Sequence, residues 1–292
     1  MSEELINAIA LNDLEKVKLL VEKGVKCPSA LRVVAAIDRF EIIKILVESG
    51  FKYPFALYVA SEKGHLEIVK FLFENGFDDY DDDDALYIAV YYGHLEIVKF
   101  LVENGFKEPF ALYVAAREGY LEIVKYLVEH NFKNAEALYE AIRYGHLELV
   151  KYLVENSFRD ERALTCAAYY GHLEIVKYLV ENGFIDEDTL YVAASKRHLE
   201  LVKYLIENGF RDKDALCIAS ENGHLEIVKI LVENGFEHKD ALYWAVKKRH
   251  LAIVKLLVKK GYTDDEVLEI AEDYGYSEIT SYLERNMKWV KI

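Results

Sequence analysis

The chain repeats one motif along nearly its whole length at an almost constant spacing. The string GHLEIVKFLVENGF begins at Gly93 and GHLEIVKYLVENGF begins at Gly171, and weaker copies lie on both sides of them. The residue two places after each start recurs every 26 residues, and only the step from Leu66 to Leu95 is longer, at 29. A fixed period of this length predicts a solenoid, because so small a repeat buries its apolar face only by stacking on its neighbours. The eleven equivalent positions are Leu14, Phe40, Leu66, Leu95, Leu121, Leu147, Leu173, Leu199, Leu225, Leu251 and Ser277.

Each repeat contains two segments in which apolar residues have helical spacing, and we name them helix A and helix B. In helix A, Leu112 and Ala115 lie three residues apart and share one face, and leucine fills the Leu112 position in every repeat. Helix B is expected over residues 121–129, with an apolar stripe on one side. The sequence therefore predicts an all-α fold, a solenoid of about eleven αα-hairpins. The expected stripe of helix B consists of Leu121, Val124, Leu127 and Val128.

Residues that favour helix ends recur in register with these segments. The three prolines, Pro28, Pro54 and Pro109, share one repeat position, which we assign to the first turn of helix A, where a missing N–H costs nothing. Glycine follows helix A in most repeats, where a residue with positive φ closes a helix. In repeats without proline, an Asn or Asp side chain is expected to cap helix A. These capping residues are Asn134, Asp160, Asp186, Asp212 and Asp264.

The repeats and the composition limit the organisation of the chain and its partners. We expect a single repeat domain over residues 1–292, with a capping repeat at about 1–26 and a second capping repeat with a tail at about 264–292. The net charge of −15 repels phosphates and anionic membrane surfaces, so we expect neither nucleic acid nor membrane as a partner. The three cysteines lie far apart without CxxC spacing, which favours a reducing compartment, the cytoplasm, over a disulfide framework or a zinc site.

The string ALYVAAREGYLEIVKYLVEHN resembles the two-helix part of an ankyrin repeat, and the resemblance recurs in register along essentially the whole chain. Ankyrin repeats have about 33 residues, and the shortfall here lies in the connection after helix B, between Gly105 and Leu112. The resemblance therefore implies an ankyrin-like solenoid that lacks most of the β-hairpin. The repeats also resemble those of stand-alone ankyrin proteins of giant DNA viruses and some protists, and a viral source would place the protein in the host cytoplasm.

One departure from the family concerns its TPLH histidine, which is replaced here, most often by tyrosine. The family's structural histidine network is therefore not carried over to this chain. The tyrosines at that position are Tyr58, Tyr87, Tyr113, Tyr139, Tyr191 and Tyr243.

The sequence offers no motif for catalysis or for a cofactor. No GxGxxG, GxxxxGK, GxSxG or HExxH pattern occurs, and the carboxylates follow the repeat. Seven of the nine histidines share the position before helix B, and stacking separates neighbouring copies by about 10 Å, too far to share one metal ion. We therefore expect no enzyme, no catalytic residue, no cofactor and no metal, and we expect these histidines to be structural. They are His65, His94, His146, His172, His198, His224 and His250.

The longer step between Leu66 and Leu95 contains an acidic run from Asp78 to Asp84. We expect a solvated connection there, with binding of a basic partner or a cation as the alternative. The run lacks the glycine and the final glutamate of a calcium-binding loop.

Tyrosine and arginine concentrate at the end of helix A in the middle repeats. In ankyrin proteins the residues just before the Gly-His pair line the concave groove, where partners commonly dock. Tyrosine and arginine often carry the binding energy of protein interfaces. The flanking repeats have ordinary solvated residues here, Glu62 with Lys63 and Ser195 with Lys196, so the repeat itself does not require the aromatic residues. The predicted partner-binding residues are Tyr91, Tyr92, Arg117, Arg143, Tyr144, Tyr169 and Tyr170.

The function predicted from these features is that of a non-catalytic scaffold, a monomer that binds a protein or peptide along the concave, helix-A face. The alternative is a self-associating structural repeat protein whose end stacks on another copy. A further interpretation is that the tyrosines at the ends of helices A only pack between repeats and bind no partner. No motif identifies the partner, because scattered side chains specify a repeat surface.

Overall fold

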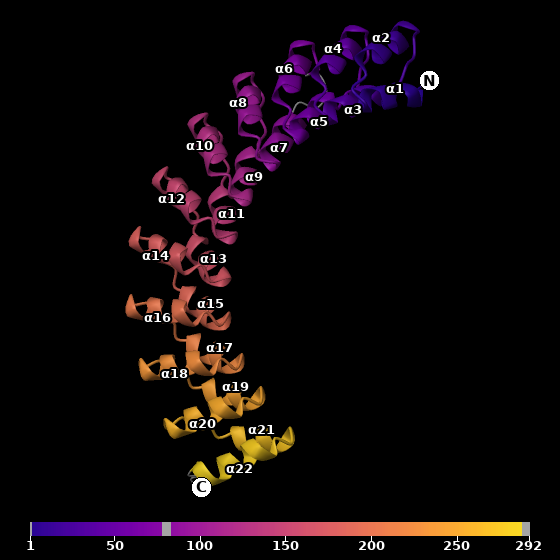
Figure 1. Cartoon of the computed structure of the whole chain (residues 1–292). Helices are drawn as coiled ribbons and strands as arrows, with labels where there is room; N and C mark the ends of the chain where they lie inside the picture. Colours follow the sequence, from indigo (N-terminus) through magenta and orange to yellow (C-terminus); the bar gives the residue numbers. More distant parts are fainter. Residues whose placement is uncertain (1, 78–82, 288–292) are drawn as a thin grey trace. The chain divides into compact units, whose positions relative to one another are not determined.

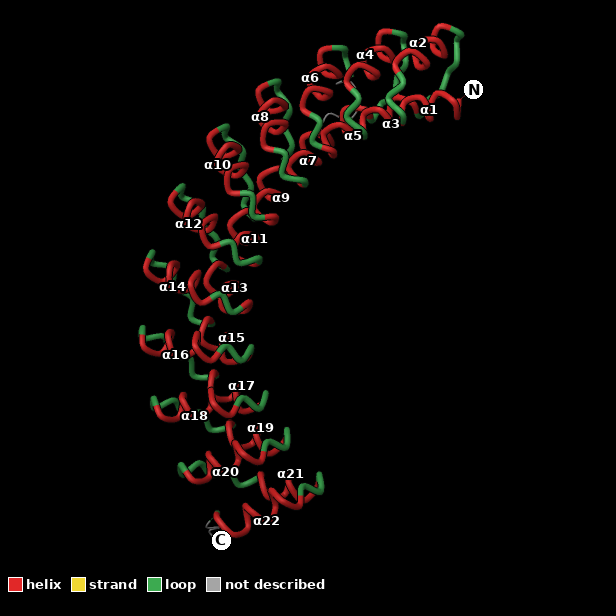
Figure 2. The backbone as a smooth tube through the Cα atoms, viewed as in Figure 1, coloured by secondary structure: helices red, strands yellow, loops and turns green. Residues whose placement is uncertain are grey.

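A computed structural model describes residues 2–77 and 83–287 of the chain. Over these residues the protein has 22 α-helices and no strand, as Figure 2 shows. The helices form eleven consecutive pairs, in which odd-numbered helices are helix A and even-numbered helices are helix B. The prediction of an all-α solenoid without the β-hairpin is confirmed. None of the helices in the described ranges combines the length and the apolar character that a membrane crossing requires.

The structure divides into two compact units, Met1–Phe158 and Arg159–Ile292. The expected organisation as one domain stays a prediction. In the first unit, helices A are α1 (Ser2–Ala10), α3 (Ala30–Ala36), α5 (Ala56–Lys63), α7 (Asp83–Tyr91), α9 (Ala111–Glu118) and α11 (Ala137–Arg143). Its helices B are α2 (Leu14–Glu22), α4 (Phe40–Glu48), α6 (Leu66–Glu74), α8 (Leu95–Glu103), α10 (Leu121–Glu129) and α12 (Leu147–Glu155).

The second unit continues the same alternation of helices, one pair per repeat. Its helices A are α13 (Ala163–Tyr170), α15 (Thr189–Ser195), α17 (Ala215–Glu221), α19 (Ala241–Lys247) and α21 (Val267–Asp273). Its helices B are α14 (Leu173–Glu181), α16 (Leu199–Glu207), α18 (Leu225–Glu233), α20 (Leu251–Lys259) and α22 (Ser277–Asn286).

Within each unit, helices A form one layer and helices B a second layer (Figure 1). Leu112 and Ala115 are fully buried between successive helices A, as their spacing predicted. The small alanine side chain lets helices A approach one another more closely than helices B do. Each unit therefore curves with its helices A on the concave side.

Helix α10 has the predicted bounds, but its buried stripe differs from the prediction. Ile123, Val124 and Leu127 are buried, whereas Leu121 and Val128 are only half-buried. Ile123 is buried because helix B packs on helix A of its own repeat and also on the neighbouring repeats, which widens its apolar face.

The turn before helix A corrects the predicted helix start. Pro109 lies in a turn, and the helix begins at Ala111, whose N–H donates to the carbonyl of Glu108 at 3.1 Å. The capping carboxylates act on the same turn, since Asp212 Oδ1 accepts the N–H of Asp214 at 2.7 Å and that of Ala215 at 2.9 Å. The side chains of Asn134, Asp160, Asp186 and Asp264 likewise accept the N–H two residues later.

In several repeats a histidine joins the repeat to the one before it. In the second unit, His198 Nε2 donates to the carbonyl of Tyr169 at 3.1 Å. Gly171 closes α13 at φ +76°, and a Cβ there would lie 2.5 Å from the imidazole of His198. This position therefore needs glycine both for its backbone conformation and for space. His65, His94, His146, His224 and His250 make the same bond, which bears out their predicted structural role.

Two segments named in the sequence analysis fall outside this description. Residues 78–82 of the acidic run and residues 288–292 of the tail lie outside the described residues. Of Asp83 and Asp84, only the backbone is described, as the start of α7.

Candidate functional site

The predicted tyrosines occupy the last turn of helix A or the position just after it, beyond the cover of helix B. Their exposed fractions are 38% for Tyr91, 47% for Tyr92, 50% for Tyr144, 47% for Tyr169 and 38% for Tyr170. Large apolar side chains are exposed at a few other places too, among them Phe55 and Phe110, but these five tyrosines gather at the ends of helices A. The rings are therefore available to a partner rather than enclosed between repeats.

In the first unit, Arg117 connects the ends of α7 and α9. Its guanidinium lies 5.7 Å from the ring centroid of Tyr91 and 6.0 Å from that of Tyr113, within reach of a cation–π interaction. It also pairs with Glu118 at 2.8 Å. Partial burial acts to lower the pKa of Arg117, but the hydrogen bond to Glu118 and its charge raise this pKa overall, so the group stays cationic. Tyr92 packs edge-on against Tyr91, with ring centroids 5.1 Å apart.

A second pair in the first unit stands at the end of α11. The guanidinium of Arg143 lies 5.4 Å from the ring centroid of Tyr144, and its Nη1 lies 3.5 Å from the buried carboxylate of Glu140. The ring of Tyr144 stacks on His146, which is itself bonded to the carbonyl of Arg117 at 3.0 Å. These contacts fix the exposed ring and reduce the side-chain entropy that it would lose on binding.

The second unit contributes the other two predicted tyrosines, at the end of α13. The rings of Tyr169 and Tyr170 meet edge-on, with centroids 5.0 Å apart. Lys196, which the sequence analysis placed outside the cluster, has its Nζ only 4.0 Å from the ring centroid of Tyr169. The sequence signal for this residue is its repeat position, because Lys196 occupies in its repeat the place that Tyr170 occupies in the repeat before it.

The predicted residues thus form three groups, two in the first unit and one in the second. Tyr91, Tyr92 and Arg117 make one group, and Arg143 with Tyr144 makes the next. Each group places a cation over an exposed aromatic ring.

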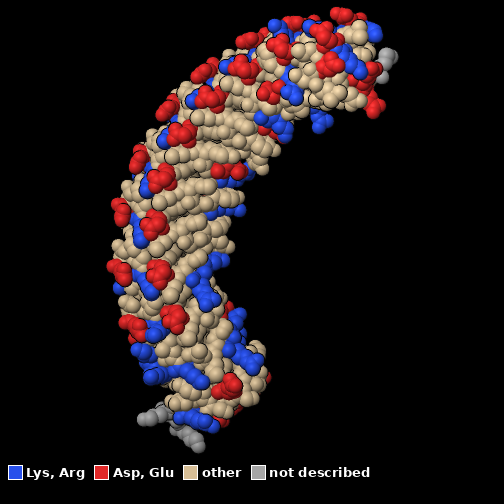
Figure 3. Space-filling model, viewed as in Figure 1, with Lys and Arg blue, Asp and Glu red and all other residues tan. Residues whose placement is uncertain are grey.

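The helix-B surface has a different electrostatic character. Many of its lysines pair with a glutamate three residues earlier, as Lys125 does with Glu122 and Lys177 with Glu174, each at 2.7 Å. The hydrogen bond from each lysine to its glutamate raises the pKa of the lysine. Figure 3 shows this alternation of acidic and basic side chains over the helices B of both units.

A family model described as "Ankyrin repeats (3 copies)" matches residues 5–81, 31–109, 104–160, 156–214, 190–267 and 216–286, which together cover almost all of the chain. The chain belongs to the ankyrin-repeat family. Ankyrin repeats are generally protein–protein interaction modules, and the proteins built from them are typically non-catalytic scaffolds. None of the curated proteins compared with the chain matches it significantly.

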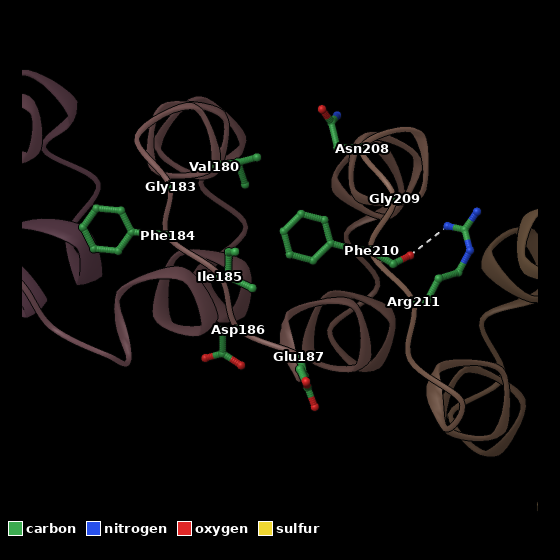
Figure 4. A pocket seen from close by; sticks show the side chains of 10 residues that line it. All are labelled: Val180, Gly183, Phe184, Ile185, Asp186, Glu187, Asn208, Gly209, Phe210 and Arg211. Carbon is green, nitrogen blue, oxygen red and sulfur yellow. Dashed lines mark hydrogen bonds between the residues drawn. The ribbon is translucent and has the colours of Figure 1, made fainter.

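The short connections of these ankyrin repeats leave hollows that the sequence analysis did not foresee. One hollow of about 470 Å³ in the second unit lies between the connections after α14 and α16 (Figure 4). Phe184 and Phe210 are among its apolar walls, and Ile185 is exposed at its edge. Arg211 turns away from it to donate to the carbonyl of Phe210 at 2.8 Å.

Polar groups around this hollow are already engaged within the ankyrin fold. The hydroxyl of Thr165 donates to Asp186, which also accepts the N–H of Asp188 at 2.9 Å. A similar hollow of about 370 Å³ lies one repeat pair further on, between residues 237–239 and 260–263. Recurrence at equivalent places indicates that the hollows arise from the missing β-hairpin.

The described part of this ankyrin chain holds no group of three or more His, Cys, Asp or Glu side chains arranged for a metal ion. None of its three cysteines, all within the described residues, forms a disulfide, and Cys27 and Cys166 are buried while Cys217 is half-buried. Burial, followed by the charges of Asp240 and Glu221, raises the pKa of the Cys217 thiol to about 11. That thiol is thus poorly suited to act as a nucleophile near neutral pH.

Proposed function

We propose that the protein is a non-catalytic scaffold that binds a protein or peptide partner along its helix-A surface. The observation that supports this most is the set of exposed tyrosines held in place by neighbouring cations and rings. The contact residues of the proposal are Tyr91, Tyr92, Arg117, Arg143, Tyr144, Tyr169 and Tyr170.

Physical chemistry favours binding over packing as the role of these rings. Exposed aromatic side chains lower solubility and commonly mark interaction surfaces. A ring that is already fixed, such as Tyr144 between Arg143 and His146, loses little entropy when a partner covers it. Tyrosine also offers a hydroxyl for a directed hydrogen bond at the edge of the contact.

The test is affinity capture with a double variant, Tyr92→Ala with Tyr144→Ala. A partner retained by the unchanged protein should bind the variant more weakly by about 2 kcal/mol or more, as expected for two hot-spot residues. The melting temperature should hardly change, because both rings are about half-exposed.

A matched control is Phe55→Ala with Phe110→Ala, which also removes two exposed rings of the first unit. These rings precede α5 and α9 and so lie at the opposite end of helix A. Loss of the partner from the tyrosine variant alone supports the proposal. Normal binding with a much lower melting temperature would identify the tyrosines as packing residues, and recovery of only the protein itself would favour self-association.

A further inference from the structure

The second unit carries cations at the ends of its helices A that lack carboxylate partners. Lys196 and Arg197 directly follow α15, whereas Lys247 is the last residue of α19 and Arg249 follows that helix by two residues. Among the described residues, none of these four has a carboxylate oxygen within 4.0 Å, whereas the intervening Lys248 pairs with Glu221 at 3.3 Å. In Figure 3 basic side chains gather over the helices A of this unit. Positive charge is therefore concentrated here on a chain with a net charge of −15.

Aromatic rings position these cations. Lys247 Nζ lies 4.9 Å from the ring centroid of Trp244 and 5.2 Å from that of Tyr243, whose hydroxyl it meets at 3.1 Å. The hydrogen bond to Tyr243 raises the pKa of Lys247 and keeps it charged. The guanidinium of Arg249 lies 5.5 Å from the ring of Tyr276. A cation held against a ring on one side keeps its remaining N–H donors for an anion on the other.

Backbone conformation gives a second, independent indication. Arg197 and Arg249 have φ values of +65° and +62°, at the position where seven repeats have glycine and the first two have Asn12 and Asp38, whose short polar side chains tolerate this conformation better than arginine does. A left-handed residue other than glycine costs about 1–2 kcal/mol. The helix macrodipole favours a cation near the C-terminal end of a helix. It acts on any residue of the last turn, however, and does not explain why an arginine occupies the position with positive φ. Strain of this kind concentrates at functional sites.

We propose that this cationic strip, formed by Lys196, Arg197, Trp244, Lys247 and Arg249, binds an extended acidic segment of the partner. The proposal rests on the proposed function and adds the chemistry of the partner to it. Carboxylates of the segment pair with the four cations, and its apolar side chains pack on the face of Trp244. The neighbouring ring of Tyr169, which Lys196 covers, continues the strip by one repeat.

A polypeptide fits this strip better than a nucleic acid does. The opposite ends of the same helices A carry carboxylates, among them Asp188, Asp214 and Asp240, which would repel a broad polyanion. Stacked helices lie about 10 Å apart, so the three steps from Tyr169 to Arg249 span about 30 Å. An extended chain rises about 3.3 Å per residue, so about nine residues cover the strip.

The experiment uses a fluorescein-labelled peptide of alternating Glu and Ser, about nine residues long to match the estimated span. Its binding to the full-length protein is followed by fluorescence anisotropy, and a peptide with Gln in place of Glu serves as the neutral probe. We expect the acidic peptide to bind and the neutral one to bind at least about tenfold more weakly, with the difference shrinking as salt screens exposed charges.

Two variants with the same change in net charge separate the strip from general attraction. The double variant Lys196→Ala with Lys247→Ala should weaken binding of the acidic peptide at least tenfold, by the loss of about two charge-assisted contacts. The control Lys177→Ala with Lys203→Ala removes two helix-B lysines of the same unit, each paired with glutamate at 2.7 Å. The control should change binding by less than about twofold, since paired surface charges contribute little.

Trp244 gives a direct signal for the site. The chain has two tryptophans, so the substitution Trp289→Phe leaves Trp244 as the reporter. Its fluorescence should change on addition of the acidic peptide and stay constant with the neutral one.

Three outcomes would overturn the inference: no binding of the acidic peptide, equal loss in the strip and control variants, or tighter binding of a single-stranded DNA of similar length at the strip. Each leaves the proposed function intact if partner capture still depends on Tyr92 and Tyr144. Conversely, if capture of the partner does not depend on Tyr92 and Tyr144 while the acidic peptide still binds normally, the proposed function is wrong and the inference about the cationic strip stands.

Discussion

The contact between Gly171 and His198 makes a quantitative prediction about repeat stacking. Gly171→Ala and Gly183→Ala both place a side chain on a left-handed backbone, at φ values of +76° and +78°. This conformation costs each variant about 1–2 kcal/mol. A Cβ at position 183 meets nothing within 4 Å, whereas a Cβ at position 171 lies 2.5 Å from His198 Cε1 and 2.6 Å from Nδ1.

Only the Gly171 variant therefore forces the imidazole of His198 to move. The ring then loses its hydrogen bond to the carbonyl of Tyr169, which is 3.1 Å long. A hydrogen bond of this kind contributes about 0.5–1.5 kcal/mol. We expect Gly171→Ala to lower the free energy of unfolding by about 1 kcal/mol more than Gly183→Ala does.

The assay is urea unfolding followed by circular dichroism, with hydrogen exchange of the amides of α13 to α16 to detect local opening. A repeat protein couples mainly neighbouring repeats, so the extra loss should be largest in these helices. Combining each substitution with His198→Ala completes the test, because the clash then disappears. The two glycine substitutions should cost the same in that background, and a persistent difference would refute the proposed contact.

Two further predictions follow from the core and from the cysteines. Leu112→Ala removes a fully buried side chain and should cost about 2–5 kcal/mol by urea unfolding, whereas Leu268→Ala at the half-buried equivalent position should cost clearly less; equal costs would mean that the helix-A core is wrongly assigned. The pKa of about 11 leaves Cys217 with roughly a hundredfold less thiolate at about pH 8 than an ordinary cysteine has. Its alkylation by iodoacetamide, followed by mass spectrometry, should be slower in the folded protein by about that factor, and a rate equal to that in urea would contradict the assigned environment.

The number and order of the helices could be predicted because every repeat shows two independent signals, the repeat period and the helical spacing of its apolar residues. Helix B over residues 121–129 has its predicted bounds for this reason. The sequence predicts a start of helix A at Pro109, two residues before the observed start at Ala111, because proline fits equally well in a helical first turn and in a turn that precedes a helix. The hydrogen bond from Ala111 to Glu108 decides between them, and the sequence does not contain that information.

The candidate site was predictable only in part. Exposure of Tyr92 and Tyr144 follows from their place beside the end of helix A, and the structure agrees with it. The contact of Lys196 with Tyr169 joins side chains on successive repeats, and it depends on the offset between stacked helices, which spacing along the chain does not give. The hollow beside Phe184 was missed because a short connection shows which residues are absent but not how the remaining ones pack.

Site-specific photocrosslinking tests the central claim, that a partner lies on the helix-A surface, most directly. A benzophenone amino acid would replace Tyr92 or Tyr144 on this surface, or else Glu96 or Glu148 on helix B of the same unit, where both carboxylates are exposed. The account predicts covalent adducts with a heterologous protein from the two tyrosine positions and none from the two glutamate positions. Adducts from the helix-B positions, with none from Tyr92 or Tyr144, would contradict it.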